Sequence, residues 1–169
     1  MTDLFNEPII PKISTRLRLG TMLLDHAFIC ILLIPFVFIF KNQIYPDIQG
    51  SEYSKYLYAP ISVIYLCKDS IHGRSLAKRT LKLTVVDFRS HKEASPIQTV
   101  IRNSLIFVWP IEVIVSFFNQ ERRIGDFFAG TRLTFNYDPK ITAHKIKLWE
   151  MTAAILIAIL ITWLVLLFF

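Results

Sequence analysis

Hydrophobic residues form long uninterrupted blocks along this chain, and polar residues gather between the blocks. The first block runs from Leu19 to Phe40 between two cations, Arg18 and Lys41. At about 1.5 Å per residue, a helix of this length can cross the roughly 30 Å hydrocarbon core of a bilayer. The last block, Met151 to Phe169, has 19 residues and no charge. Both blocks therefore predict transmembrane helices.

Two further blocks predict less regular crossings. Residues 56–67 are free of charge but short for a span, so we expect a short or tilted helix there. Residues 101–118 (IRNSLIFVWPIEVIVSFF) have the length of a span but contain Pro110 and Glu112. They form either a full crossing or a broken, re-entrant pair of short helices hinged near Trp109 and Pro110.

Two short segments between these blocks have the pattern of β-strands. In LKLTVVD, residues 81–87, Leu81, Leu83 and Val85 alternate with the other side chains. A second strand-like segment, TRLTFNYD, covers residues 131–138. We expect the two segments to pair antiparallel, because an isolated strand edge leaves its backbone groups unmatched.

These elements predict an all-α membrane protein, a small bundle of three to four transmembrane helices with a short cytoplasmic β-ribbon. The number is three if residues 101–118 re-enter and four if they cross fully. The expected parts are a cytoplasmic tail over residues 1–15, a membrane domain over 16–138, and a linker with an extra C-terminal transmembrane helix over 139–169.

Charge indicates how the helices are oriented. Residues 68–102 and 119–148 together hold fourteen of the nineteen Lys and Arg residues, and basic loops usually face the cytoplasm. A multi-pass protein of the plasma (inner) membrane with a cytoplasmic N-terminus fits this distribution. Residues 119–148 are then cytoplasmic if residues 101–118 re-enter, and external if residues 101–118 cross fully. No nucleic-acid recognition module accompanies the net charge of +6. The basic side chains after the second block can bind anionic lipid headgroups: Lys68, Arg74, Lys78, Arg79 and Lys82.

Asp25 is the unusual residue of the first block. A charge inside a span costs about 2.5–3.5 kcal/mol on insertion scales, so Asp25 needs a partner or a function. Arg18 lies seven residues earlier and shares its helix face. Further charges near the membrane are Asp69, Arg102, Glu112, Arg122, Arg123 and Asp126. Arg102 is the simplest partner for Asp25, which then belongs either to an ion or proton path or to a structural ion pair.

Three segments of the chain resemble the RDD family of small membrane proteins. Arg18 and Asp25 match an Arg-x6-Asp pattern, KDSIHGRSLAKRTLKLTVVD resembles a second family segment, and RRIGDFFAGTRL a third. The resemblance covers about residues 15–137 and implies that Arg18, Asp25 and Asp126 are the residues that name the family. It adds Gly73, Lys78, Arg102, Gly130 and Thr131 as secondary motif positions. Ala77 departs from the pattern, because the family favours Gly there.

The family resemblance implies transport, with cation/proton exchange as the suggested activity. In that mechanism Asp25, helped by Glu112, binds a proton or a cation. The alternative is a non-catalytic accessory or assembly subunit of a larger membrane complex. Either role implies the bilayer and a homo-oligomer or other membrane subunits as partners. We expect no enzyme, because residues 73–77 lack the second Gly of a nucleophile elbow and the Lys-Ser/Thr ending of a phosphate loop. The four His residues are too scattered to predict a metal site, and no cofactor is expected.

Overall fold

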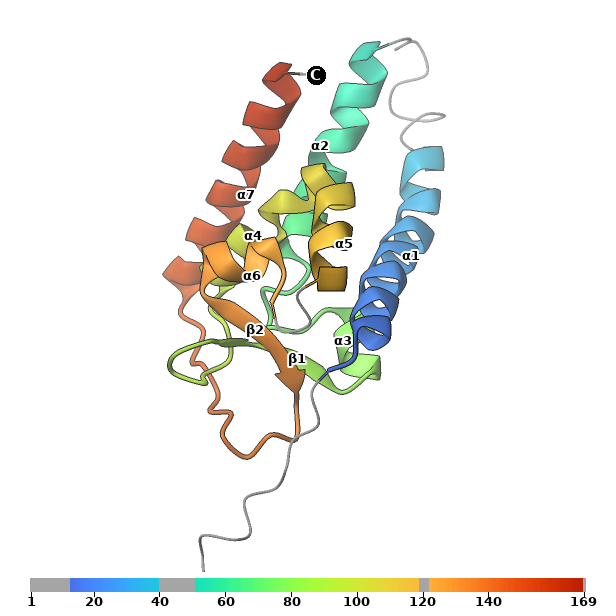
Figure 1. Cartoon of the computed structure of the whole chain (residues 1–169). Helices are drawn as coiled ribbons and strands as arrows, with labels where there is room; N and C mark the ends of the chain where they lie inside the picture. Colours follow the sequence, from blue (N-terminus) through green and yellow to red (C-terminus); the bar gives the residue numbers. More distant parts are fainter. Residues whose placement is uncertain (1–12, 40–50, 119–121, 169) are drawn as a thin grey trace, which may run out of the picture.

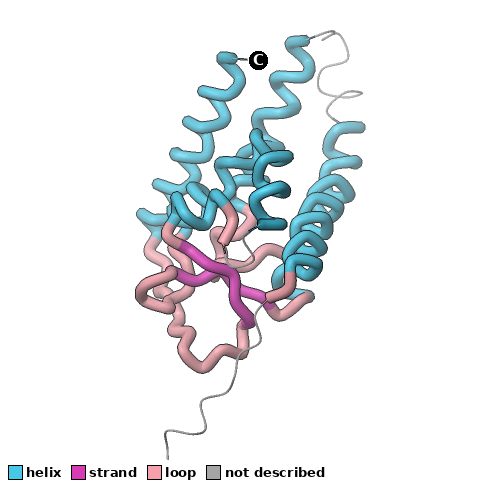
Figure 2. The backbone as a smooth tube through the Cα atoms, in the orientation of Figure 1, coloured by secondary structure: helices cyan, strands magenta, loops and turns pink. Residues whose placement is uncertain are grey.

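The fold consists of long helices that stand on a small layer of strands and loops. It is taken from a computed structural model, which describes residues 13–39, 51–118 and 122–168. Three longer helices, α1 (Thr15–Ile39), α2 (Ser51–Cys67) and α7 (Leu148–Phe168), extend from one end of the molecule. α2 runs opposite to α1 and α7 (Figure 1). Strands and loops gather at the end where α1 and α7 begin (Figure 2).

Two of these helices are long and apolar enough to cross a membrane. Within the described residues, Thr15–Ile39 and Leu148–Leu167 meet this test of length and composition, while the apolar part of α2, Leu57–Cys67, is shorter. The predicted helical class is confirmed, since the chain is mostly helical with one small sheet. The three to four crossings stay a prediction.

The sheet is the predicted ribbon. Strand β1 (Leu83–Asp87) pairs antiparallel with β2 (Thr131–Phe135), with Leu83 opposite Phe135 and Asp87 opposite Thr131. Alternation indicated only one buried face, but Thr84 and Val86 are buried as well as Leu83 and Val85. The Thr84 hydroxyl donates to the carbonyl of His72 (3.2 Å). The loop before α3 therefore covers the face expected to be open.

Short helices connect the ribbon to the bundle. Helix α3 (Leu76–Thr80) begins after Ser75, whose hydroxyl accepts the Lys78 amide. Helix α4 (Pro96–Asn103) begins with a reciprocal cap, in which Ser95 and Gln98 accept each other's backbone amides. Helix α6 (Ile124–Ala129) ends at Gly130, which has a positive φ of 64°.

Of the two alternatives for residues 101–118, the structure has the broken one, with the turn just before the expected hinge at Trp109 and Pro110. After α4 the chain forms a 3₁₀ turn over Ser104–Val108, and α5 (Trp109–Phe118) then runs back toward the ribbon (Figure 1). Residues 101–118 are therefore not one continuous helix. This reversal brings both ends of the segment to the level where the charged side chains of the chain gather.

Two apolar clusters fix the arrangement. One packs the ribbon against the start of α1, with Ile13, Leu83, Val85, Ala94 and Leu133 buried. The other joins α2, α4 and α7 through Leu66, Val100, Ala154 and Ala158. The small Ala side chains let α7 approach α2 closely, as small residues do in membrane helix pairs.

Candidate functional site

Nine ionisable side chains are buried together where the helices meet the ribbon. We call this group the charge cluster. Each side chain is at least nine-tenths buried. Its members are Arg18, Asp25, Lys68, Asp69, Lys78, Arg102, Glu112, Arg123 and Asp126. Ions taken out of water at this depth cost several kcal/mol each unless they are paired and hydrogen-bonded, so their contacts decide what the site can do.

Lys78 is at the centre of one half of the cluster. Its Nζ donates to Asp25 Oδ2 (3.0 Å), Asp69 Oδ1 (2.7 Å) and Ser75 Oγ (3.2 Å). These three acceptors match the three donors of an ammonium group. Ser75 serves twice, because its hydroxyl also starts α3 and thereby fixes the helix that carries Lys78. Lys68 Nζ adds a second cation, 3.3 Å from Asp25 Oδ2.

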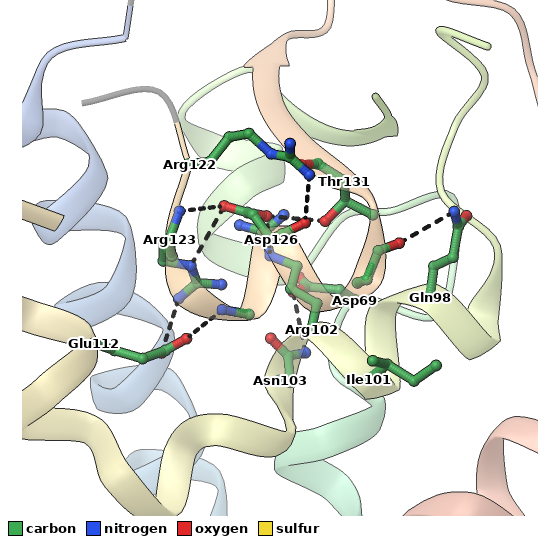
Figure 3. A network of polar contacts seen from close by, with 12 residues as sticks. Asp69, Gln98, Ile101, Arg102, Asn103, Glu112, Arg122, Arg123, Asp126 and Thr131 are labelled. Carbon is green, nitrogen blue, oxygen red and sulfur yellow. Dashed lines mark hydrogen bonds and ion pairs between the residues drawn. The ribbon is translucent and has the colours of Figure 1, made fainter. Parts of the chain in front are cut away.

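Asp126 is at the centre of the other half. Arg102 Nε lies 3.2 Å from Asp126 Oδ1, which also accepts from Thr131 Oγ1 (2.9 Å). Asp126 Oδ2 accepts the backbone amide of Arg123 (3.1 Å), and the Arg123 side chain lies between Asp126 and Glu112 (Figure 3). Asp126 therefore starts α6 and binds two arginines at once.

The two halves meet through α4. Asn103 Nδ2 donates to Asp69 Oδ2 (3.3 Å) and to the Leu66 carbonyl (3.2 Å), while the preceding residue, Arg102, faces Asp126. Successive residues of a single helix thus contact Asp69 on one side and Asp126 on the other.

The pKa values of the charged groups outside the apolar helices follow from these pairs. Burial alone would raise the pKa of Asp69, but Lys78 and Lys68 hold it below its usual range. Burial would also raise the pKa of Asp126, but Arg102 and Arg123 lower it below its usual range. The pKa of Lys78 is lowered by burial, against the opposing effect of Asp69 and Asp25. Both aspartates are ionised at neutral pH, and the ammonium loses its proton more easily than an exposed lysine.

Two cavities reach the cluster. One of about 170 Å³ lies between α1, α2 and α3 and is lined by Asp25, Lys68 and Ser75 among apolar side chains. The other is much smaller, about 10 Å³, and its charged lining residues are Arg18, Asp25, Lys78, Arg102 and Arg123. Asp25 lines both cavities, so the cluster has a larger pocket on one side and a small polar space on the other.

The structure brings the predicted site residues together but changes one pair. Arg18, Asp25, Arg102, Glu112 and Asp126 all belong to the charge cluster. The predicted pair of Asp25 with Arg102 was wrong. Asp25 contacts Lys78 and Lys68, because α3 and the end of α2 face it, and Arg102 contacts Asp126.

The sequence RRIGD predicts that Asp126 pairs with Arg122, four residues earlier, or with Arg123, three residues earlier. Arg123 contacts the carboxylate as predicted, whereas Arg122 donates to the backbone carbonyl of Asp126 (2.9 Å) and to that of Thr131 (3.2 Å). The Arg122 guanidinium also lies over the Phe88 and Phe127 rings. Its role is to join α6 to β2.

The secondary motif positions have local structural roles. Lys78 donates to Asp25 and Asp69, Thr131 donates to Asp126, and Gly130 ends α6. Gly73 has a φ of 63°, and a side chain there would collide with the Val85 carbonyl. Ala77 is fully buried, so the methyl group that replaces the favoured Gly is accommodated.

Sequence reasoning noted some cluster members without assigning them to the site. Asp69 was counted only as a charge near the membrane, and Lys68 as a group for lipid headgroups. Asn103 was missed. The signal that could have found them is the pair Lys68-Asp69. Two opposite charges directly after an apolar helix indicate a buried ion-pair site at the end of that helix.

The arrangement is a buried ion-pair site. Within residues 13–39, 51–118 and 122–168, no group of three His, Cys, Asp or Glu side chains is placed to hold a metal ion. Comparison with protein-family models, with curated proteins and with solved structures finds no match for this chain. The RDD resemblance therefore stays a prediction.

Proposed function

We propose that the chain is a multi-pass membrane protein of RDD type that exchanges a small monovalent cation for a proton at Lys78, Asp25 and Asp69. The observation that carries the proposal is the buried Lys78 ammonium, which donates to both carboxylates at 3.0 and 2.7 Å. A cation of the same charge can replace an ammonium between two carboxylates without changing the charge of the cluster.

The exchange balances in protons and charge. Lys78 releases one proton and becomes neutral, one monovalent cation enters between the oxygens of Asp25 and Asp69, and the Ser75 hydroxyl supplies a third oxygen. The reverse step protonates Lys78 and expels the cation. Burial lowers the pKa of Lys78, which brings its proton loss closer to neutral pH.

Access to this centre is available through the larger pocket. The space of about 170 Å³ between α1, α2 and α3 reaches Asp25, Lys68 and Ser75. In the proposed cycle, cations and protons reach the cluster through this pocket. In the proposed cycle, the cation and the proton reach the opposite side of the membrane only in a second conformation of the protein.

The membrane assignment rests on α1 and α7. Leu23, Ile31 and Phe38 of α1 are 72%, 65% and 67% exposed, which suits contact with lipid. In the proposed orientation the ribbon end is cytoplasmic in the inner membrane, because the basic residues 68–102 and 122–148 are at that end.

Lys78→Arg tests the exchange most sharply. Arginine keeps the positive charge but does not deprotonate, so the variant should assemble and lose cation-dependent proton flux at least tenfold in proteoliposomes. Lys92→Arg is the matched control, because Lys92 is exposed and outside the cluster. Full flux in Lys78→Arg contradicts a proton carried by Lys78.

A second candidate function is that of an accessory subunit. A groove of about 650 Å³ between α1 and α2 is lined by apolar side chains such as Leu33, Val37 and Ile61, and a helix of another subunit could occupy it. Mild detergent extraction followed by identification of co-purifying proteins distinguishes the two roles. A stable heteromeric complex without flux in liposomes favours the subunit.

A further inference from the structure

The pocket of about 170 Å³ between α1, α2 and α3 is lined by one of the two lysines that contact Asp25. We call it the access pocket. Lys68, Asp25 and Ser75 form its polar lining. Its other lining residues are apolar: Phe28, Ile29, Leu32, Ile64 and Leu76. Lys78 lines the small polar space on the other side of Asp25 instead. Lys68 is therefore the amine that a proton or a cation in the access pocket contacts directly.

The two lysines share one oxygen atom. Lys78 Nζ donates to Asp25 Oδ2 at 3.0 Å, and Lys68 Nζ lies 3.3 Å from the same oxygen. Lys78 also donates to Asp69 and to Ser75, so each proton of its ammonium group has an acceptor. A single carboxylate oxygen thus connects the inner amine to the amine at the access pocket.

The surroundings of Lys68 favour the loss of its proton. Its side chain is 9% exposed, and its Nζ lies 3.8 Å from the centre of the Tyr65 ring. Four charged side chains face it from the surrounding elements: Asp25, Asp69, Lys78 and Arg123. Burial lowers the pKa of Lys68, against the effect of the two aspartates, and Arg123 lowers it further. A lysine in such a place can give up a proton and take it back.

We propose that Lys68 is the proton relay of the exchange, which passes the proton of Lys78 to the access pocket across Asp25 Oδ2. Lys68 first releases one proton to a water molecule that enters the pocket. The N–H bond of Lys78 then breaks as an O–H bond forms on Asp25, and that O–H bond breaks as an N–H bond forms on Lys68. Lys68 is charged again, Lys78 is neutral, and one cation enters beside Asp69. This inference rests on the proposed exchange.

The first test measures proton release without flux. The purified full-length protein in detergent is treated with trace acetic anhydride at a series of pH values, and each acetylated lysine is quantified by peptide mass spectrometry. Because only the neutral amine reacts, half-maximal acetylation marks the pH at which a lysine loses its proton. Exposed Lys92 should reach it near the ordinary value of about 10.4, and Lys68 at least about one pH unit lower.

The same measurement compares the two buried lysines. Lys78 does not line the access pocket and should stay unmodified in the folded protein. Acetylation of Lys78 before Lys68, or no acetylation of Lys68 while Lys92 reacts, overturns the proposal. This test uses the unmodified chain, so it decides the question even if variants at position 68 do not assemble.

The second test is chemical rescue in proteoliposomes, with sodium as the probe cation. Lys68→Ala should lose sodium-dependent proton flux by at least about tenfold. Ethylamine fits the space that the lysine leaves and carries a proton, so it should restore the flux several-fold. Tetramethylammonium has the charge but no N–H bond and should not. Equal rescue by both compounds means that Lys68 only supplies charge, and it contradicts the relay.

Lys78→Ala is the matched control for the rescue. Its side chain does not line the access pocket, so ethylamine should not restore its flux, and it also corrects for amine that crosses the bilayer unaided. Full flux in Lys68→Ala beside full flux in the unmodified protein contradicts the relay alone. An unmodified protein without flux contradicts the proposed exchange, while the acetylation profile still shows whether Lys68 releases its proton to the pocket.

Discussion

Asp126 has no exposed surface, and its carboxylate is held by Arg102, Arg123 and Thr131. Asp126→Asn keeps the shape and one acceptor but removes the carboxylate that faces buried Arg102 and leaves Arg123 with Glu112 alone. We expect the free energy of unfolding to fall by about 3–5 kcal/mol, the usual cost of breaking a buried pair from one side. Denaturant titration in mild detergent measures it.

The matched control is Asp87→Asn. In a half-exposed turn, Asp87 accepts from the backbone amides of Arg89 and Ser90 through Oδ1, which asparagine keeps, and from Gln98 through Oδ2, which asparagine loses. Its cost should stay below about 1 kcal/mol. Equal costs at the two positions would mean that burial of the charge pair does not decide stability.

The lowered pKa values of Asp69 and Asp126 predict how stability depends on acid. A carboxyl group whose pKa is lower in the folded chain contributes stability that is complete above its unfolded pKa, about 3.9, and is lost as pH falls through its folded pKa. The free energy of unfolding, measured from pH 7 to pH 2, should therefore depend little on pH above about pH 5, where the contribution of these groups is complete, and fall steeply below about pH 4. In Asp126→Asn the free energy of unfolding should fall less steeply with acid, by the slope that corresponds to one proton.

At the scale of elements, Gly125 sets how closely α6 approaches α4. A side chain at this position would overlap the Arg102 carbonyl and touch Glu112 Oε1. Gly125→Ala must push the two helices apart or shift Arg102, which disturbs the pair with Asp126. We expect a loss of about 1–3 kcal/mol, the range of overpacked sites, and a thermal midpoint lower by about 2–4 °C per kcal/mol.

Gly20 provides the control for this substitution. It lies inside α1, and a side chain there would meet nothing within 4 Å. Gly20→Ala should be neutral or stabilising by up to about 1 kcal/mol, because Ala favours a helix more than Gly does. Destabilisation by both substitutions would refute the close approach of α6 and α4 as the cause.

Most elements of this fold could be predicted from the sequence, because their signals are local. Uninterrupted apolar blocks indicated α1 and α7, alternation indicated β1 and β2, and the Pro within residues 101–118 indicated the break. The burial of both faces of β1 could not be predicted, since the cover comes from the turn around His72, outside the strand.

The site could be predicted as a set of residues but not as pairs. The buried charges stood out because charge is rare beside apolar helices. Which cation meets Asp25 depends on how α1 is rotated about its axis, and α1 is apolar on almost every side, so its sequence does not indicate that rotation. Lys78 becomes the partner only because the Ser75 cap directs α3 toward α1.

At the scale of the whole molecule, the ribbon joins two basic stretches at one end. Because β1 and β2 pair, Ser90 and Asn136 must be on the same side of any membrane that α1 and α7 cross. We expect that side to be the cytoplasm. Single cysteines at Ser90 and Asn136, with Cys30 and Cys67 replaced, should resist an impermeant thiol reagent on intact cells.

Permeabilised cells provide the control, since both cysteines should then react. Labelling of Asn136 alone from outside would contradict the shared side and support a full crossing by residues 101–118. Labelling of both positions from outside would agree with the paired strands but place the ribbon on the external side of the membrane.

The contact between Lys78 and Asp25 joins residues that are 53 positions apart. Ribosomes add about 5–20 residues per second, so Asp25 leaves the ribosome roughly 3–10 s before its partner. If the first helix crosses a bilayer, as we propose, it carries an acid during that interval before Lys78 has been made. We expect it to be held at the translocon or at the membrane surface until the segment with Lys78 follows. The order of synthesis thus makes α1, the first helix to appear, one of the last to be secured.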